Sequence, residues 1–174
     1  MDYHTLAVHG GRHDEKNEKI KPVNYPVYLS STFVQNSLDE FNEFMYSRSK
    51  NPTRDNVEQA AAQLEGAKYG LALSSGMAAV SLVFSLVRPG EKVLVNTSVY
   101  GGTWNYISHI FPDRDIEVET VKDFSSYDWD SLDDNVTAVY IETPSNPLME
   151  VTDIRSLANK VKERGLRLLV DNTF

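Results

Sequence analysis

From residue 53 onward, short apolar runs alternate with segments of helical periodicity, and only a few residues connect them. Runs typical of strands lie at residues 69–73, 92–96, 116–121, 137–142 and 167–172. Segments typical of helices lie at residues 53–65, 77–87, 104–110 and 152–164. This alternation predicts an α/β fold, with a mostly parallel sheet and helices on both of its faces. The apolar residues of 77–87 surround that helix, so we expect it to be buried on most sides.

Residues 1–53 show no sustained period and contain a polar run at 14–19 and several prolines. This pattern is typical of an extended arm with short turns. A segment of that length without a core of its own is uncommon within a compact domain. We therefore expect the arm to contact a neighbouring subunit and the α/β domain to occupy residues 54–174.

Composition excludes several kinds of partner and site. The chain carries 17 basic and 25 acidic residues, a net charge of −8, without a basic stripe for nucleic acid or anionic lipid. It has no cysteine, so it forms no disulfide and no thiolate site, and we expect no metal. Neither a signal peptide nor a membrane span is evident. We expect a cytoplasmic protein that binds neither nucleic acid nor membranes.

Ligands of parallel α/β sheets bind beyond the carboxyl ends of the strands, where the tripeptide Ser75-Gly76-Met77 is one candidate. It follows a strand-like run and opens an apolar helix. Free N–H groups at a helix N-terminus bind anions such as phosphate, and small residues allow close approach. An ordinary helix cap followed by a glycine turn would produce the same pattern.

Asp171 is a second candidate, because it ends the apolar run 168–171. A buried carboxylate needs a cation or hydrogen-bond donors, so Asp171 is suited to a ligand nitrogen. The alternative is a local hydrogen-bond network with the neighbouring Asn and Thr. Tyr100 follows the strand at 92–96, where its ring could cover a planar ligand or only the edge of the core.

Two further candidates lie in loops. Asn146 stands between Pro144 and Pro147, which restrict the backbone and would position the amide; an ordinary turn is the alternative. Tyr46 and Arg48 belong to the arm, where Arg48 could bind a phosphate or simply be solvated. Together the candidates suit a ligand with a phosphate, a flat ring and a basic ring nitrogen, and pyridoxal 5′-phosphate has all three.

Seven strings of the chain also match, in order, those of one enzyme family. The two most specific are Tyr-Ser-Arg-Ser-Lys-Asn-Pro-Thr-Arg at 46–54 and Glu-Thr-Pro-Ser-Asn-Pro at 142–147. The others lie at 26–33, 64–67, 74–79, 100–103 and 170–174. On these strings the chain resembles the N-terminal part of the pyridoxal-phosphate enzymes of cysteine and methionine metabolism. Cystathionine γ-lyase, cystathionine γ-synthase and methionine γ-lyase belong to this family.

The resemblance implies an incomplete large domain of fold type I, similar to that of aspartate aminotransferase. It implies that Asp171 pairs with the protonated ring nitrogen and that the backbone of Gly76 and Met77, beside Ser75, holds the phosphate. Tyr100 would stack on the ring and take part in proton transfer. Asn146 would hydrogen-bond near the ring oxygen or the substrate carboxylate.

The resemblance also implies that Tyr46 and Arg48 reach the cofactor phosphate of a neighbouring subunit, in a dimer or a dimer of dimers. The reaction it implies is elimination or replacement at the β- or γ-carbon of a sulfur amino acid, with cystathionine-type substrates expected. The family's Schiff-base lysine lies further along the chain than Phe174, and none of the nine lysines falls in its motif. Residues 1–174 alone are therefore predicted to be inactive.

Two alternatives remain open. The chain could be a truncated, non-catalytic paralogue that supplies Tyr46 and Arg48 to a full-length partner. It could also be an α/β domain for a different phosphorylated ligand.

Overall fold

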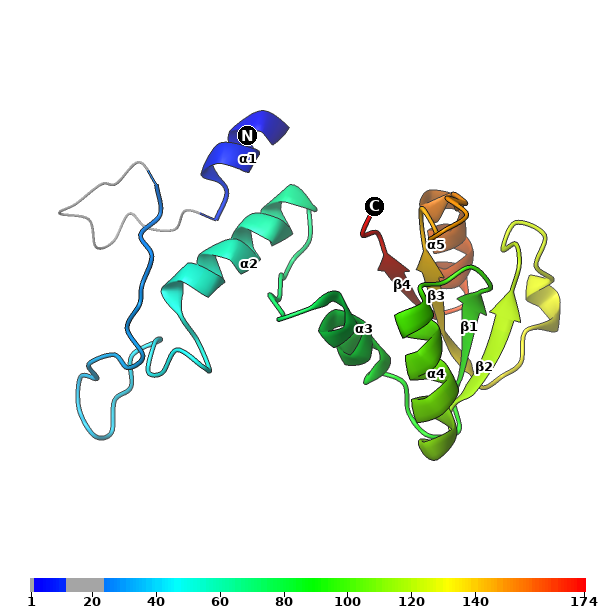
Figure 1. Cartoon of the computed structure of the whole chain (residues 1–174), viewed down its shortest axis with the longest axis horizontal. Helices are drawn as coiled ribbons and strands as arrows, with labels where there is room; N and C mark the ends of the chain where they lie inside the picture. The colour runs from blue at the N-terminus through cyan, green and yellow to red at the C-terminus, as the bar shows by residue number, and fades with distance from the viewer. Residues whose placement is uncertain (1, 12–23) are drawn as a thin grey trace. The chain divides into compact units, whose positions relative to one another are not determined.

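The computed structural model describes residues 2–11 and 24–174, and the chain divides into two compact units, Met1–Ala72 and Leu73–Phe174 (Figure 1). The polar run at 14–19 lies outside the described residues. The division falls beyond residue 53, the expected end of the arm, because the helix that follows belongs to the first unit. That residues 1–53 contact a neighbouring subunit stays a prediction.

Two helices, α1 (Tyr3–His9) and α2 (Pro52–Leu64), pack together in the first unit. The short helix α1 was not expected from the sequence. The side chain of Asp2 accepts a hydrogen bond from the Thr5 N–H and thereby caps it. The N–H of Gly11 then donates to the side chain of Gln63 at 3.0 Å, which fixes the end of α1 against α2.

The sequence pattern offers Thr53 as the cap of helix α2, but the cap is Asn51, two residues earlier. The Asn51 side chain accepts from the Thr53 N–H at 2.8 Å. Pro52 occupies the first turn, where its missing N–H is not needed. The Thr53 hydroxyl instead accepts from the N–H of Tyr28 at 2.9 Å and ties the preceding extended segment to the helix.

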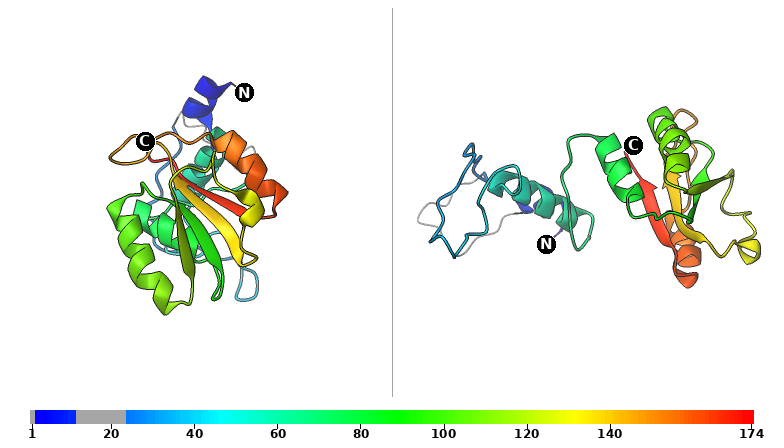
Figure 2. Two further views of the ribbon diagram at one scale, coloured as in Figure 1. Left: turned by 90° about the vertical axis from the view of Figure 1, so that its right-hand side faces the viewer. Right: turned by 90° about the horizontal axis from the view of Figure 1, so that it is seen from below.

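The second unit is built on a four-stranded sheet in which each neighbouring pair of strands is parallel, in the order β2-β1-β3-β4 (Figure 2). The strands are β1 (Lys92–Asn96), β2 (Glu117–Val121), β3 (Val136–Glu142) and β4 (Arg167–Asp171). The predicted α/β class with a parallel sheet is confirmed. Strands at the predicted positions also place their carboxyl ends along one edge, because all four run in the same direction.

Helices cover both faces of this sheet, as predicted. Helices α3 (Gly76–Phe84) and α4 (Gly101–Asp113) pack on one face, where Phe84 and Phe111 meet edge to face. Helix α5 (Ile154–Glu163) and the short 3₁₀ helix η1 (Trp129–Ser131) cover the other face. Alternation along β1 supplies both cores, since Val93 and Val95 face α3 and α4 while Leu94 faces α5.

Two predictions for this region are wrong. Residues 69–73 form no strand; Tyr69 and Leu71 are exposed, and the N–H of Ala72 donates to the Glu58 side chain instead of to a ladder. Helix α3 is buried on one face only, since its apolar residues continue onto the exposed side. The spacing of apolar residues does not by itself distinguish a strand from an exposed apolar run, or a buried helix from one with an exposed apolar side. No helix of the described segments is long and apolar enough to cross a membrane.

Candidate functional site

A cavity of about 410 Å³ lies at the carboxyl ends of β3 and β4, beside the first turns of α3 and α4. Six of the eight predicted site residues line it, although they come from four separate segments of the chain. The lining residues are Ser75, Gly76, Met77, Val80, Tyr100, Glu142, Pro144, Asn146, Asp171, Thr173 and Phe174.

The first turn of α3 presents two free donors to this cavity. The Ser75 side chain accepts from the N–H of Ala78 at 3.1 Å, and its carbonyl accepts from Ala79. These two bonds leave the N–H groups of Gly76 and Met77 without an acceptor among the described residues. A Cβ added at Gly76 would meet no atom within 4 Å, so there is open space beside this residue on the cavity. The arrangement is suited to an anion.

Tyr100 immediately precedes α4, and its ring is about half exposed on the cavity. The ring lies against the backbone of Gly102, where an added Cβ would overlap the ring and would also lie 3.1 Å from the Met77 sulfur. A glycine at 102 is therefore what allows the ring to occupy this position. The N–H of Tyr100 donates to the Glu142 carboxylate at 2.6 Å.

Two carboxylates, those of Glu142 and Asp171, stand opposite each other at the ends of the paired strands β3 and β4. The hydroxyl of Tyr140 lies between them, 3.1 Å from Glu142 and 3.4 Å from Asp171. Burial raises the pKa of Tyr140, and the charges of the two carboxylates raise it further, so the hydroxyl remains a donor. Among the described residues, no Lys or Arg forms an ion pair with either carboxylate.

Asp171 is held in place from both sides of its carboxylate. One oxygen accepts from the Thr173 N–H at 3.1 Å and from the Thr173 hydroxyl at 2.6 Å, and the other faces Tyr140. This local network is the alternative that the sequence left open. It does not neutralise the carboxylate, so Asp171 retains a negative charge that a cationic ligand nitrogen could pair with.

Asn146 is exposed in the loop after β3, and its neighbour Ser145 fixes that loop. Ser145 is fully buried; its hydroxyl accepts from the N–H of Glu150 at 3.1 Å and bonds to Ser98. Thr143 contributes in the same way, since its hydroxyl accepts from the Thr152 N–H at 2.9 Å. The loop therefore presents Asn146 at the cavity from an anchored backbone.

Tyr46 and Arg48 lie in the first unit, and the Arg48 guanidinium stands 5.1 Å from the centre of the Tyr46 ring. Other residues of the same string hold the loop: Ser47 N–H donates to Ser31 at 2.8 Å and Arg54 donates to the Ser47 carbonyl. Arg48 is exposed and has no ion pair with a described residue. Its predicted role at a neighbouring subunit stays a prediction.

Sequence reasoning missed the part played by Glu142 and by Gly102. Glu142 ends a buried strand as Asp171 does, so the same pattern could have indicated it. Gly102 carried no comparable signal, because only the placement of the Tyr100 ring reveals why a side chain is excluded there.

A second cavity, of about 470 Å³, lies on the α5 side of the sheet. None of the predicted residues lines it. Its lining mixes two lysines, Lys122 and Lys160, with the carboxylates of Asp123, Glu150 and Asp153, whereas the described lining of the first cavity has carboxylates and no Lys or Arg.

The structural comparison places this parallel sheet, with its free helix N-terminus and unpaired carboxylates, in the fold type I pyridoxal-phosphate class. The crystal structure of metB from Corynebacterium glutamicum matches it with a TM-score of 0.90 and 36% identity, over 100% of this chain and 46% of that one. The chain belongs to the family of Cys/Met metabolism PLP-dependent enzymes, whose model matches residues 4–174. The resemblance inferred from the seven strings is confirmed.

Individual relatives give the same result. The chain is 40% identical over 171 residues to the cystathionine gamma-synthase/O-acetylhomoserine (thiol)-lyase of Bacillus subtilis, covering 97% of this chain and 45% of the relative. It is 38% identical to the cystathionine gamma-lyase of the same organism, covering 100% of this chain and 46% of the relative. The crystal structure of cystathionine gamma-lyase from Lactobacillus plantarum complexed with L-serine matches with a TM-score of 0.88 and 34% identity, over 99% of this chain and 45% of that one. The chain thus spans slightly less than half the length of these relatives.

Proposed function

We propose that residues 73–174 form part of a pyridoxal 5′-phosphate site. The complete protein would be a carbon–sulfur lyase or transferase acting on cystathionine-type amino acids. One observation carries the proposal: a single cavity combines the free N–H groups of Gly76 and Met77, the ring of Tyr100 and the charge of Asp171. The similar proteins of Bacillus subtilis are cystathionine lyases and a cystathionine synthase, which supports the substrate class.

The residues present fit this cofactor. The open space beside Gly76 would admit a phosphate, which would accept from the two N–H groups and gain from the helix dipole. Asp171 has no cationic partner in the described structure, and it would hold the proton on the ring nitrogen. The Tyr100 ring would cover one face of the pyridine, and Asn146 would donate to its ring oxygen or to the substrate carboxylate.

When bound, pyridoxal phosphate supplies an electron sink for the charge left at the substrate Cα after proton removal. The residues of this chain would orient the cofactor ring and transfer protons. By keeping the ring nitrogen protonated, Asp171 would maintain its electron demand. The Tyr100 hydroxyl would move a proton at the substrate, toward the sulfur that leaves or the carbon that receives a new bond.

No lysine is among the described residues that line the cavity, and we propose that the lysine that attaches the cofactor is not one of residues 1–174. We therefore propose that residues 1–174 bind the cofactor without turning over substrate. The exposed, unpaired Arg48 supports a second candidate function, in which this chain supplies Tyr46 and Arg48 to the cofactor phosphate of a full-length partner. We further propose that the protein assembles as a dimer or a dimer of dimers and that it lies in the cytoplasm.

Binding can be tested with 4′-deoxypyridoxine 5′-phosphate, which lacks the aldehyde and needs no lysine. Trp104 lies one turn beyond Tyr100 in α4 and is about half exposed, so we expect its fluorescence to be quenched. The same compound without the phosphate should bind at least about tenfold more weakly, because it cannot use the α3 donors. Equal affinity for the two compounds, or no binding at all, would contradict the proposal.

Catalysis is tested separately. Borohydride reduction in the presence of pyridoxal 5′-phosphate, followed by peptide mapping, should label no lysine of residues 1–174 stoichiometrically; one stably labelled lysine would show that the chain is competent alone. The complete protein should cleave or form cystathionine, measured by release of thiol and 2-oxo acid. A complete protein without either reaction would exclude the proposed substrate class.

A further inference from the structure

Glu142 is the one buried ionisable group at the described cavity to which the proposed function gives no role. It is the last residue of β3 and is only 5% exposed. Its own N–H donates to the Asn96 side chain of β1 at 3.1 Å, so its backbone is fixed at the centre of the sheet. Burying a carboxylate here is unfavourable unless its oxygens find donors.

Both oxygens of Glu142 do find donors, and each donor leads to a residue of the cavity. One oxygen accepts from the backbone N–H of Tyr100 at 2.6 Å, which holds the start of α4 and with it the Tyr100 ring. The other accepts from the Tyr140 hydroxyl at 3.1 Å, and that hydroxyl also faces Asp171 at 3.4 Å. The Glu142 carboxylate thus connects Tyr100, which would cover the face of the cofactor ring, to Asp171, which would pair with the ring nitrogen.

The titratable groups around Glu142 support the same connection between Glu142 and Asp171. The titratable groups facing Glu142 are Tyr140 on β3 and Asp171 on β4, with Tyr100 at the start of α4, while α3 has no titratable residue. A hydroxyl has one proton, so Tyr140 donates fully to only one of the two carboxylates at a time. Its shorter contact is to Glu142, which leaves an oxygen of Asp171 available to a ligand.

We propose that Glu142 is a positioning residue, which orients Tyr100 through its backbone N–H and Asp171 through the Tyr140 hydroxyl, and whose charge adds to that of Asp171 at the ring nitrogen. The inference rests on the proposed function. A bound cation near two carboxylates is stabilised by both, so removing the second charge lowers the pKa of the bound ring nitrogen even when Asp171 remains.

The test uses the 174-residue chain with 4′-deoxypyridoxine 5′-phosphate labelled with ¹⁵N in the ring. The ¹⁵N shift, followed against pH, gives the pKa of the bound ring nitrogen. We expect Glu142→Gln to lower that pKa by about one unit and to weaken binding about tenfold at neutral pH. Glu150→Gln is the matched control, because it removes the same charge from an exposed side chain of the following loop; it should change neither quantity.

Tyr140→Phe provides the second variant, because it removes only the hydroxyl between the carboxylates. Because the hydroxyl faces the Asp171 carboxylate, we expect its removal to move that carboxylate and change the pKa of the ring nitrogen, while the hydrogen bond from the Tyr100 N–H to Glu142 stays intact. Glu142→Gln should instead shift the Tyr100 amide proton resonance and accelerate its exchange. A purely structural role for Glu142 would alter amide signals along α4 without moving the pKa of the ring nitrogen. If Glu142→Gln does not fold, Tyr140→Phe decides.

The inference is overturned if both variants keep the pKa of the ring nitrogen and the affinity within twofold of the unaltered chain. Failure of the unaltered chain to bind the compound is a different result, because it removes the proposed function. The positioning part is then decided without ligand, by the ¹³C resonance of the Asp171 carboxyl group. That resonance should move in Glu142→Gln and Tyr140→Phe but stay in place in Glu150→Gln.

Discussion

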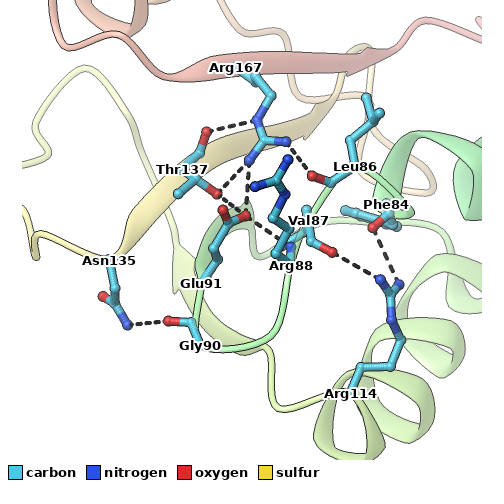
Figure 3. A network of polar contacts seen from close by, with 10 residues as sticks. All are labelled: Phe84, Leu86, Val87, Arg88, Gly90, Glu91, Arg114, Asn135, Thr137 and Arg167. Carbon is cyan, nitrogen blue, oxygen red and sulfur yellow. Dashed lines mark hydrogen bonds and ion pairs between the residues drawn. The ribbon is translucent and has the colours of Figure 1, made fainter.

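At the amino ends of the strands, cationic and anionic side chains are paired. The guanidinium of Arg167 donates to the Thr137 hydroxyl at 2.8 Å and to the Glu91 carboxylate at 3.0 Å, and it also reaches the Leu86 carbonyl (Figure 3). Lys92 forms ion pairs with Glu117 and Asp133. These groups join β1, β2, β3 and β4 at one edge, beside Arg114, which donates to the Val87 carbonyl.

At the carboxyl ends of the same strands, charge is not balanced. Glu142 and Asp171 share one phenol hydroxyl, and no described Lys or Arg pairs with them. The difference separates two uses of charge within one sheet. At the amino edge, the charged side chains neutralise one another. At the carboxyl edge, unpaired carboxylates lie beside free N–H groups, which suits this edge to a zwitterionic ligand. Changes at the amino edge should therefore affect stability, and changes at the carboxyl edge should affect binding.

The largest expected effect is on binding. Asp171→Asn removes the charge that would hold the proton on the ring nitrogen, so we expect 4′-deoxypyridoxine 5′-phosphate to bind about 100-fold more weakly, as measured by fluorescence titration. Glu91→Gln removes an equal charge from the opposite edge and should leave the affinity unchanged. Equal losses in the two variants would show that net charge, rather than position, determines binding.

Arg167→Ala should have the largest effect on stability. It breaks hydrogen bonds to Thr137 and Leu86 and leaves the partly buried Glu91 without its cation, so we expect the free energy of unfolding to fall by about 2 kcal/mol. Urea unfolding followed by tryptophan fluorescence reports this directly, because both tryptophans lie in the second unit. Arg155→Ala on α5 is the control: Arg155 is exposed, and the described contacts include none from its side chain. A similar loss in both variants would contradict the special role of the amino edge.

A pair of glycines tests the phosphate position. Gly76 and Gly101 each open a helix, and at both positions an added Cβ would meet no atom within 4 Å. Alanine should therefore leave stability unchanged or raise it slightly in both variants. Only Gly76 lines the cavity, so we expect Gly76→Ala alone to weaken binding of the phosphate compound, by about tenfold. Equal affinity in the two variants would place the phosphate elsewhere.

The smallest effect concerns pH. Burial by itself raises the pKa of Glu91, but hydrogen bonds from the Arg88 N–H, the Thr137 hydroxyl and Arg167 outweigh it and hold the pKa below the ordinary 4.5. A carboxyl group whose pKa is lowered on folding stabilises the protein above its unfolded-state pKa, and that contribution is lost as the pH falls through the folded-state pKa. Stability should thus decline below about pH 4.5 in the unaltered chain.

Glu91→Gln should reduce the loss of unfolding free energy at low pH by about 1 kcal/mol. The effect is this small because the Glu91 side chain is partly exposed. Urea midpoints measured between pH 3 and pH 6 provide the comparison. A decline as steep in the variant as in the unaltered chain would assign the acid sensitivity to other carboxyl groups.

Strands β1, β2, β3 and β4 and helices α3, α4 and α5 lie close to the positions that the sequence pattern predicts. Local rules explain this success, because apolar period and capping residues act over a few neighbours. Residues 69–73 show where such rules fail, since an apolar run becomes a strand only when a neighbouring strand accepts its hydrogen bonds. Helix α1 was missed for the opposite reason: a single cap and a few contacts with α2 decide it.

The sequence by itself determined the α/β class, the family and the identity of the candidate groups at the strand ends, because these follow from local pattern and from ordered strings. Tertiary structure alone decided how the groups combine. Parallel pairing brings Glu142 opposite Asp171 from 29 positions apart in the chain, and Gly102 admits the Tyr100 ring. Which carboxylates remain without a cation depends on where every Lys and Arg side chain ends in space, and short-range pattern does not carry that information.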